Sequence, residues 1–531
     1  MLNRQSLAWS PWKYQAFRAI WTAGLVSNLG NWMQNVTAAW MMTSLSDAAI
    51  MVALIQTASA LPSFLLALPA GALADLVDRR RVMLLAQCWM LLSCIALSVV
   101  TLSGAMNTTL LLILTFSVGL GNAFQLPSQQ ATTSDVVPQA EVPLAVMLSG
   151  ISFNMARAVG PVAAGLIVAW LGSGAVFVVN VVSFGTVIAL LWSWKSPTRG
   201  KTMPRERMLA GMASGLWYVR HSPTIRRLEL RSSVFILSAS ALWALLPLIA
   251  RSELGLGAFG YGLLLGCLGL GSIVAAAIMP LVRRRVGLET MITWSTICFA
   301  VAGVVVAFVP VMLLVCVLLV LVGMSWIMIN ATINAVVHTS VANWVRARTL
   351  AIHLFCFQGS MAFGAVLWGA LATLAGTTVS LAVACASMLL GLAFTSRWPL
   401  AMGTEDDTAL APVQAVRLKG EQPASDAGRV YVRVLYRVGA ANVDAFMEAM
   451  RPLGQARLRN GARRWRIRRP TSVCAPVSEF YFFDDWQQWL QFRARRVMFE
   501  QGLETDTQQM LRPDSPVVIS LRVAGVRRTF A

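Results

Sequence analysis

Charged side chains and histidines are scarce in this sequence. Of the 531 residues, 12% are charged, three are histidines and 57% are hydrophobic. Soluble globular proteins and disordered chains are both excluded as classes, because neither can keep so much apolar surface in water. The eight cysteines and three histidines show no metal-ligand spacing, so no metal site is predicted.

Long stretches without Asp, Glu, Lys or Arg dominate the chain. About 20 apolar residues in a helix cross a bilayer core of about 30 Å. Single spans are predicted within 19–46, 48–74, 232–250 and 254–282, and two spans each within 82–134, 142–194, 290–345 and 349–396. The predicted fold class is therefore an all-α membrane protein with twelve transmembrane helices.

Basic residues fall in every second connection between these spans. They occur at Arg79–Arg81, within 195–231, at Arg283–Arg285, and at Arg346 and Arg348. Short loops rich in Lys and Arg stay on the cytoplasmic side of a membrane. We therefore expect a multi-pass protein of the cytoplasmic (inner) membrane with both termini in the cytoplasm.

The two sets of six spans resemble each other at an offset of 204 residues. This offset places Arg79–Arg81 on Arg283–Arg285, Gly160 on Gly364 and Gly165 on Gly369. A parallel repeat of this kind is typical of transporters whose two halves alternately expose a central cavity. The predicted bundles are residues 1–195 and 232–400.

The remaining segments are more polar. Residues 196–231 are predicted as a cytoplasmic linker whose helix 208–219 carries Met208, Met212, Leu216 and Val219 on one face, and 401–428 as a second linker. Residues 429–531 are predicted as a small α+β ferredoxin-like domain, with strands at 430–438, 465–469, 479–483 and 517–523 and helices at 442–459 and 486–510. The arginines of the central loop and of 457–469 suggest anionic lipid as a partner, alongside the bilayer itself; nucleic acid is not expected.

The loop after the second span reads GALADLVDRRR and contains Gly71, Asp75, Arg79, Arg80 and Arg81. It resembles the loop signature of the major facilitator superfamily, in which these residues belong to a gating motif. Glycine would allow close helix packing, and the arginines could pair with the aspartate or with a helix terminus. Leu76 and Asp78 depart from the common pattern, as they do in drug and siderophore exporters.

The fifth span contains Arg157, Gly160, Pro161 and Gly165 in a segment similar to the antiporter signature of exporters in this superfamily. Residues 121–143 and 215–231 resemble the enterobactin exporter and macrolide efflux branch, of the transmembrane secretion effector type with an appended cytoplasmic C-terminal domain. The resemblance implies two six-helix halves and transport by alternating access.

Arg157 lies near the middle of its span, where a charge costs at least about 2.5 kcal/mol. None of the acids in residues 1–400 is expected at its depth, or within the core of any span. Arg157 either receives an anionic substrate group or gates the pathway, or it bonds to Asn, Gln or backbone carbonyls and holds the bend at Gly160 and Pro161. His338 and His353, near the cytoplasmic ends of spans ten and eleven, are interpreted as structural.

Neutral polar side chains within the spans are candidates for lining a substrate cavity. They are Asn31, Gln34, Asn35, Asn122, Gln125, Asn154, Asn330, Asn334 and Gln358. About half are expected on the cavity, since lipid-facing amides are disfavoured, and the others in hydrogen bonds between helices. Trp32, Trp40, Trp243 and Trp326 could add aromatic surface, although packing is their more usual role.

The predicted function is secondary active export of amphipathic small molecules, such as siderophore-like or drug-like metabolites, coupled to protons. Three alternatives remain open: a lysophospholipid flippase, an uptake carrier, and a membrane-anchored monooxygenase-like enzyme. The transport interpretation needs no catalytic residue and no cofactor.

Overall fold

The computed structural model describes residues 10–193, 208–342, 344–400, 402–404, 408–411, 428–472, 475–512 and 517–523. Two compact units are present, and each is described by itself. Unit 1 comprises Met1–Pro204, Glu229–Ile333 and His353–Pro399; unit 2 comprises Arg205–Leu228, Asn334–Ile352 and Leu400–Ala531. Residues 334–352 thus group with the linker helix and the tail in unit 2, and the predicted domain boundaries stay a prediction.

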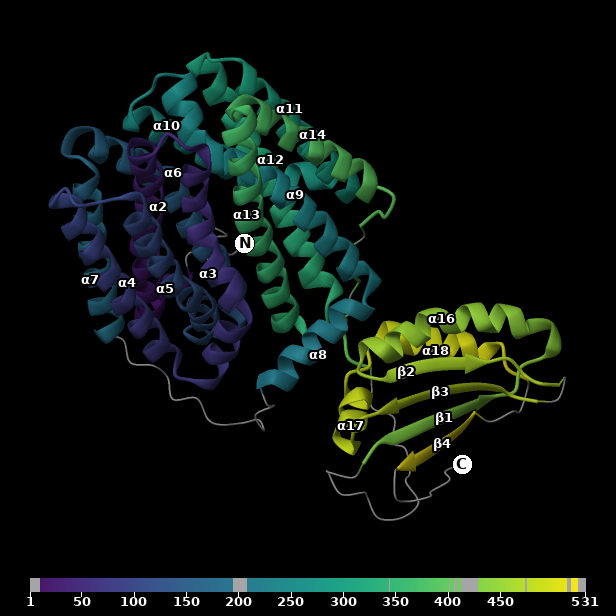
Figure 1. Cartoon of the computed structure of the whole chain (residues 1–531). Coiled ribbons are helices and arrows are strands. Elements are labelled where there is room, and N and C mark those ends of the chain that lie inside the picture. The colour runs from purple at the N-terminus through teal and green to yellow at the C-terminus, as the bar shows by residue number, and fades with distance from the viewer. Residues whose placement is uncertain are drawn as a thin grey trace, which may run out of the picture. The chain divides into compact units, whose positions relative to one another are not determined.

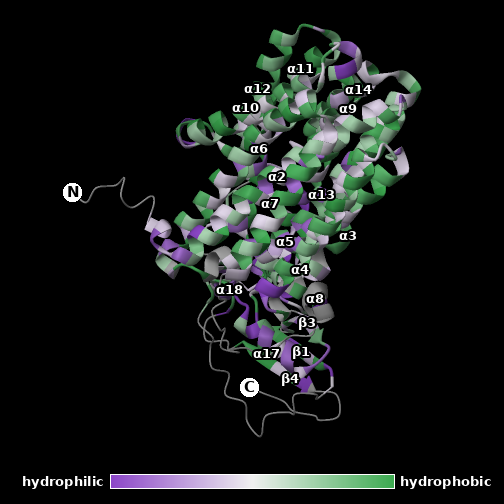
Figure 2. Cartoon of the chain, turned by 90° about the vertical axis from the view of Figure 1, so that its left-hand side faces the viewer, coloured by the Kyte–Doolittle hydropathy of each residue, from purple (hydrophilic) through white to green (hydrophobic). Residues whose placement is uncertain are grey.

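Twelve long helices account for most of the chain (Figure 1). The first six are α2 (Gln15–Leu45), α3 (Ala49–Leu76), α4 (Arg79–Leu102), α5 (Thr108–Asp135), α6 (Val142–Leu171) and α7 (Ser173–Ser193). The second six are α9 (Pro223–Leu248), α10 (Ala258–Arg285), α11 (Leu288–Phe308), α12 (Met312–Ser340), α13 (Arg346–Ala375) and α14 (Thr377–Thr395). Hydrophobic residues predominate along these helices, as Figure 2 shows.

Eleven of these helices are long and apolar enough to cross a membrane. The exception, α2, has 31 residues but a lower hydropathy, because it carries Asn28, Asn31, Gln34 and Asn35. It packs against α3, α6 and α7 within the bundle. The protein is thus a twelve-helix membrane protein, as its sequence predicts.

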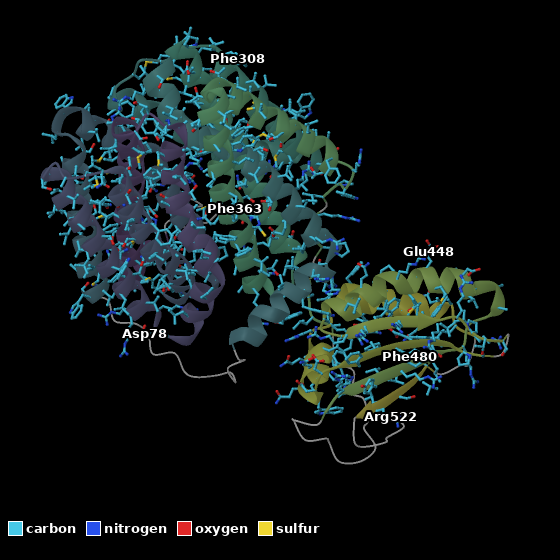
Figure 3. All side chains as sticks on the ribbon, in the orientation of Figure 1. Asp78, Phe308, Phe363, Glu448, Phe480 and Arg522 are labelled. Atoms are coloured by element: carbon cyan, nitrogen blue, oxygen red, sulfur yellow. The ribbon has the colours of Figure 1, made fainter. Side chains whose placement is uncertain are left out.

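Three of the turns between helices contain a glycine in the left-handed region. Gly104, Gly172 and Gly376 have φ values of 72°, 81° and 89°, which residues other than glycine rarely adopt. They lie at one end of the bundle, which we call the neutral end. Arg79–Arg81 and Arg283–Arg285 lie at the opposite, basic end. Asp78 and Phe308 mark the basic and neutral ends in Figure 3.

Helix α9 begins at Pro223, well before the predicted start at residue 232. The prediction ended the span where charges begin, but the helix continues through Glu229 and Arg231, which are 6% and 4% exposed. Glu229 therefore lies within α9 and not in the loop before it. An ionisable partner for each charge, His353 for Glu229 and Glu289 for Arg231, explains why the helix tolerates them.

The internal repeat is visible in the helix starts and in the packing. The first residues of α5 and α12, Thr108 and Met312, are 204 positions apart, as are those of α6 and α13 and of α7 and α14. A Cβ added to Gly165 in α6 would lie 2.7 Å from the Ala258 carbonyl oxygen of α10. At the equivalent Gly369 in α13, a Cβ would lie 3.2 Å from Cα of Ile50 in α3. The two halves therefore meet through equivalent close contacts, α6 on α10 and α13 on α3.

The C-terminal part of unit 2 is an antiparallel sheet with strand order β2-β3-β1-β4. The elements follow as β1 (Val430–Tyr436), α16 (Val443–Arg459), β2 (Arg463–Arg468), β3 (Val477–Phe483), α17 (Trp486–Ala494), α18 (Met498–Gln509) and β4 (Val518–Val523). Helices α16 and α18 lie along one face of the sheet (Figure 1). This order and pairing match the predicted ferredoxin-like arrangement.

Two features of this region differ from the predictions. The single helix expected over 486–510 is divided into α17 and α18, because the backbone of Arg496 and Met498 bonds to Ala411 and Ala409 instead of continuing the helix. The arginines of 457–469 do not share one face. Arg457 is enclosed beside Glu479 and Glu504, whereas the exposed Arg466 and Arg468 alternate with partly buried positions along β2.

The linker helix α8 (Met208–His221) forms as predicted but presents a different face. The side chains of Met208 and Met212 lie outside the described residues. Leu216 is 62% exposed while Val219 is 8% exposed, so these two residues do not share one covered face. Instead Trp217 donates from Nε1 to the Leu458 carbonyl oxygen of α16 at 2.7 Å. The helix is therefore packed on protein along this side.

Candidate substrate site

Arg157 lies at the centre of an aromatic cluster built from four helices. Its guanidinium carbon is 5.8 Å from the ring centre of Trp32 in α2, 5.9 Å from Trp243 in α9 and 5.7 Å from Trp326 in α12. Arg157 itself, in α6, is only 6% exposed. Helices α2 and α6 belong to the first half and α9 and α12 to the second. The cluster therefore joins the two halves around one cation.

The aromatic rings partly replace the hydration that Arg157 loses. A cation over an aromatic face gains about 0.5–2 kcal/mol, more where water is excluded. One guanidinium nitrogen, Nη2, is buried and has no hydrogen-bond partner among the described residues. A buried donor without a partner is costly. Nη2 can therefore donate a hydrogen bond to an acceptor on a ligand. An anionic acceptor would bind there most favourably.

Further aromatic rings extend the cluster. Trp326 lies 4.3 Å from Trp243 and 6.0 Å from Phe357 between ring centres. On the other side, Trp32 makes an edge contact with Phe153, which is 43% exposed. Such surfaces suit a ligand with an apolar or aromatic body. Arg157 was singled out by its charge in the sequence, but its enclosure by three tryptophans depends on helix packing.

The candidate cavity amides separate into different environments. Asn31 and Asn122 exchange side-chain hydrogen bonds of 2.9 and 3.3 Å between α2 and α5. Gln34 is 1% exposed and accepts hydrogen bonds from Asn180 at 2.6 Å and from Cys94 at 3.0 Å. Gln34 therefore bonds helices within the first half in this conformation. The sequence does not reveal these hydrogen bonds of Gln34, because they depend on which helix each face of α2 contacts.

The other amides remain candidates. Asn35 is exposed although it lies within α2, and it accepts a hydrogen bond from Ser59 at 3.2 Å. Asn154 and Asn330 donate hydrogen bonds to backbone carbonyls of their own helices. Gln125 is buried and Gln358 is half-buried. Asn334 is exposed and belongs to unit 2. A lining role for these side chains stays a prediction.

The gating-motif loop connects α3 to α4 at the basic end. Asp78 caps α4 by accepting from the Arg80 backbone N–H at 3.0 Å. Arg80 donates to the last carbonyls of α7, to Leu191 at 2.9 Å and Trp192 at 2.6 Å. A cation there also complements the negative end of the helix dipole. The side chain of Asp75 lies outside the described residues. The gating role of Asp75, Arg79 and Arg81 stays a prediction.

The motif glycines differ in what they contact. A Cβ on Gly71 would meet no atom of the described residues within 4 Å, so close packing does not explain this glycine in the present conformation. A Cβ on Gly160 would lie 2.9 Å from Cβ of Trp32. Gly160, next to Pro161, therefore brings α6 close to α2 directly beside the Arg157 cluster.

Polar contacts also join the halves at the neutral end. Arg251, in the π-helical turn Ile249–Glu253 after α9, donates to Thr43 Oγ1 at 3.0 Å and Ser44 Oγ at 2.6 Å. Trp40 stacks on Tyr261 with ring centres 5.8 Å apart. Together with the α6–α10 glycine contact, these interactions hold the neutral end closed.

Two small pockets lie elsewhere in the bundle. One, of about 20 Å³, is lined by residues of α2, α5 and α6 including Asn28 and Gln129. The other, of about 10 Å³, lies beside Arg231 in the second half. Each has room for roughly one water molecule. Arg157 is covered in this conformation, so a ligand would reach it only when the halves separate.

Charge pairs in the second half were missed at the sequence level. Glu229 Oε2 lies 3.1 Å from Nδ1 of His353, and both side chains are 7% exposed. Arg231 Nη1 binds both carboxylate oxygens of Glu289, at 2.6 and 2.8 Å. The signal that could have revealed them is the spacing of Glu229 and Arg231 directly before an apolar run.

Comparison with known proteins decides the family. The chain matches the transmembrane secretion effector family over residues 6–529. It belongs to this family of major facilitator exporters. The multidrug efflux pump Tap of Mycolicibacterium fortuitum is 28% identical over 397 residues, covering 70% of this chain and 92% of the pump. The staphyloferrin A transporter of Staphylococcus aureus is 22% identical over 343 residues, covering 64% and 85%.

Solved structures agree with the fold. An inward-facing bacterial homologue of the human lysosomal transporter Spinster aligns with a TM-score of 0.59 and 12% identity, covering 72% of this chain and 96% of that one. The nucleoside transporter NupG aligns with a TM-score of 0.53 and 10% identity, covering 72% and 98%. The protein is a secondary transporter that exports small molecules, and the expectation that it is not an enzyme is confirmed.

Proposed function

We propose that this transporter exports amphipathic small molecules that carry an anionic group, of the siderophore-like or antibiotic-like kind. The observation that supports this most is Arg157, a buried cation with an open donor inside three tryptophan rings. The cation would receive the anionic group and the rings the apolar body of the substrate. The named cargoes of the relatives, several drugs for one and a siderophore for the other, are compatible with this class.

We further propose that the basic end and both termini face the cytoplasm of a bacterial inner membrane. The arginines at this end support the assignment through the preference of Lys and Arg for the cytoplasmic side. With that orientation, the closed neutral end faces outward. A substrate would then enter from the cytoplasm, bind at Arg157 and leave after the neutral end opens, with proton entry driving the cycle.

The test uses everted membrane vesicles, in which export appears as accumulation inside the vesicle. The probes are the anionic dye fluorescein and the cationic dye ethidium. Arg157→Gln should lower the initial rate for fluorescein at least about tenfold, which corresponds to about 1.4 kcal/mol. Arg157→Lys should fall in between, since it keeps the charge but loses the planar fork. Arg18→Gln, an exposed arginine of α2, is the matched control.

The result that contradicts the proposal is fluorescein accumulation by Arg157→Gln at the wild-type rate. Accumulation of ethidium alone would contradict the anionic class. Movement out of everted vesicles against a gradient would indicate the uptake carrier that the sequence left open. A lysophospholipid with a fluorescent headgroup, tested in the same vesicles, addresses the flippase.

Anionic lipid is our proposed partner for the sheet of the C-terminal domain. Three rings, Tyr431, Phe480 and Phe482, occupy neighbouring positions on β1 and β3. Arg433 and Arg468 lie over the Phe480 ring at 5.2 and 5.5 Å. Interleaved aromatic and basic side chains are typical of surfaces that bind anionic headgroups.

The lipid proposal is tested with the full-length protein in nanodiscs of phosphatidylcholine alone or with phosphatidylglycerol. Phosphatidylglycerol should slow amide exchange in β1 and β3. The double variant Arg433→Glu with Arg468→Glu should abolish that protection. Equal exchange in both nanodiscs for the wild type would contradict the proposal.

A further inference from the structure

Glu229 and His353 form a buried acid–imidazole pair between two membrane-spanning helices. Nδ1 of His353 lies 3.1 and 3.2 Å from the two carboxylate oxygens of Glu229. Glu229 is the seventh residue of α9 and His353 the eighth residue of α13. At 1.5 Å per residue, both lie about 10 Å in from the basic ends of their helices. Buried titratable groups within spans are expensive, and they commonly mark proton pathways.

Among the ionisable groups around it, the Glu229–His353 pair is the one that can bind and release a proton. Arg231 in α9 is engaged bidentately by Glu289 of α11, so its charge is already balanced. Cys356, one turn after His353, adjoins Glu229 and contributes a thiol. Nearer their ends, the same helices carry Arg226 and Arg227 in α9 and Arg346 and Arg348 in α13, and α12 carries His338. Helix α14, which packs on α11, presents hydroxyls such as Ser387 and Thr395 and no charged residue along Thr377–Thr395.

A short chain of contacts links the pair to the Arg157 cluster. Phe357 lies one turn beyond His353 in α13, and its ring is 6.0 Å from that of Trp326. Trp326 in turn lies 5.7 Å from the Arg157 guanidinium. Helix α9 carries Glu229 at one end and Trp243 of the cluster further along. A shift of α9 against α13 would therefore change the geometry of both the Glu229–His353 pair and the Arg157 cluster.

We propose that the Glu229–His353 pair binds the proton that is exchanged for substrate. This inference rests on the proposed function, which assigns export driven by proton entry. A proton taken up on the imidazole converts a buried pair of net charge −1 into a neutral ion pair. Its release to the cytoplasm restores the negative charge. Because a net charge in a buried site costs more than a neutral pair, the two states favour different packing of α9 and α13.

The first experiment distinguishes proton-driven accumulation of the substrate from its passive equilibration through the protein. In everted vesicles with an acidic interior, wild-type protein should accumulate fluorescein. Glu229→Gln should lose at least about nine-tenths of this accumulation, yet equilibrate fluorescein down its gradient within about threefold of the wild-type rate. His353→Gln should behave in the same way, and Glu229→Asp should recover part of the accumulation. Glu448→Gln, an exposed acid on α16 (Figure 3), is the matched control.

The second measurement needs no substrate. Spin labels on Leu171 and Ala375, exposed positions at the neutral ends of α6 and α13, report the separation of the halves. The wild-type distance distribution should shift between pH 8 and pH 5, and Glu229→Gln should show no shift. Uphill accumulation by Glu229→Gln equal to wild type, or a preserved pH shift in both Glu229→Gln and His353→Gln, would overturn the proposal. Should wild-type vesicles move no probe, the proposed function fails, while the spin-label comparison still decides the role of the pair.

Discussion

Arg157 is stabilised by aromatic rings on three helices. Gly160 has a decisive part in this arrangement, because it lets α6 approach α2 closely enough for Trp32 to reach the cation. The charge was legible in the sequence, since an arginine within an apolar span stands out. The aromatic cluster could not be recognised in the sequence, because tryptophans in spans usually pack or anchor at interfaces. Their grouping depends on which helices contact each other.

Trp326 is predicted to contribute to substrate affinity. Trp326→Leu removes one ring over Arg157 and the contact with Phe357. A cation–π contribution of about 0.5–2 kcal/mol corresponds to a rise of about 2- to 30-fold in the fluorescein concentration that gives half-maximal transport. Trp170→Leu changes a tryptophan that is 81% exposed and should leave this concentration unchanged. An unchanged value in Trp326→Leu would contradict the assignment.

Glu479 organises the core of the C-terminal domain. It is fully buried and accepts hydrogen bonds of 2.7 Å from Tyr436 Oη and from Trp465 Nε1. Hydrogen bonds to a charged group contribute about 1.5–3 kcal/mol each. Glu479→Gln should therefore lower the local unfolding free energy of β1 and β3 by at least about 2 kcal/mol, measured by native-state hydrogen exchange on the full chain. No loss relative to Glu448→Gln would contradict this role.

Tyr436 makes the same domain sensitive to high pH. Burial and the neighbouring Glu479 carboxylate raise the pKa of Tyr436 well above its usual value. Because the folded pKa exceeds the unfolded value of about 10, the contribution of neutral Tyr436 to stability is complete below about pH 10 and is lost as the pH rises further. Local unfolding free energies of β1 should thus fall above pH 10 in wild type and fall less steeply in Tyr436→Phe. Equal slopes would contradict this explanation.

At the scale of elements, most helices could be predicted and one helix start could not. The long apolar stretches of the sequence were sufficient to predict the membrane-spanning helices. The start of α9 was misplaced because Glu229 and Arg231 look like loop charges until their partners, His353 and Glu289, are brought beside them by the fold. The break between α17 and α18 was missed for a similar reason, since it depends on pairing with residues 409–411.

The contact between α6 and α10 is predicted to be necessary for closing the neutral end. A side chain at Gly262 would collide with backbone atoms of Pro161 and Gly165, neither of which can give way easily. Gly262→Val should hold the neutral end apart and lower fluorescein accumulation at least about tenfold. Gly185→Ala, where a Cβ meets no atom of the described residues within 4 Å, is the control. Wild-type spin-label distances between positions 171 and 375 in Gly262→Val would contradict the prediction.

Helix α8 is predicted to depend on Trp217 for its attachment to the C-terminal domain. Trp217 donates to Leu458, and Arg463 stacks on its ring at 4.1 Å. Trp217→Ala removes both contacts and should speed amide exchange in α8 and at the end of α16. Leu216→Ala changes an adjacent exposed residue and should not. Unaltered exchange in Trp217→Ala would show that other contacts suffice.

For the whole molecule, the repeat explains why two halves of different sequence can form one transporter. Equivalent glycines, Gly165 and Gly369, make equivalent contacts across the halves, while the buried ionisable groups differ. Arg157 has Met361 at its repeat position, and Glu229 and His353 have no charged counterparts at the same offset. The architecture was therefore predictable from the sequence, whereas the chemistry depends on residues that break the symmetry and on partners that only the fold reveals.

Alternating access requires that the two halves move about the Arg157 cluster so that one end opens as the other closes. Spin labels on Leu171 and Ala375 report the neutral end, and labels on two exposed residues, Trp192 in α7 and Ser396 directly after α14, report the basic end. We expect two populations in which a long distance at one end accompanies a short distance at the other, with acidification changing their ratio. Distances that stay fixed at both ends, or that lengthen together, would contradict alternating access.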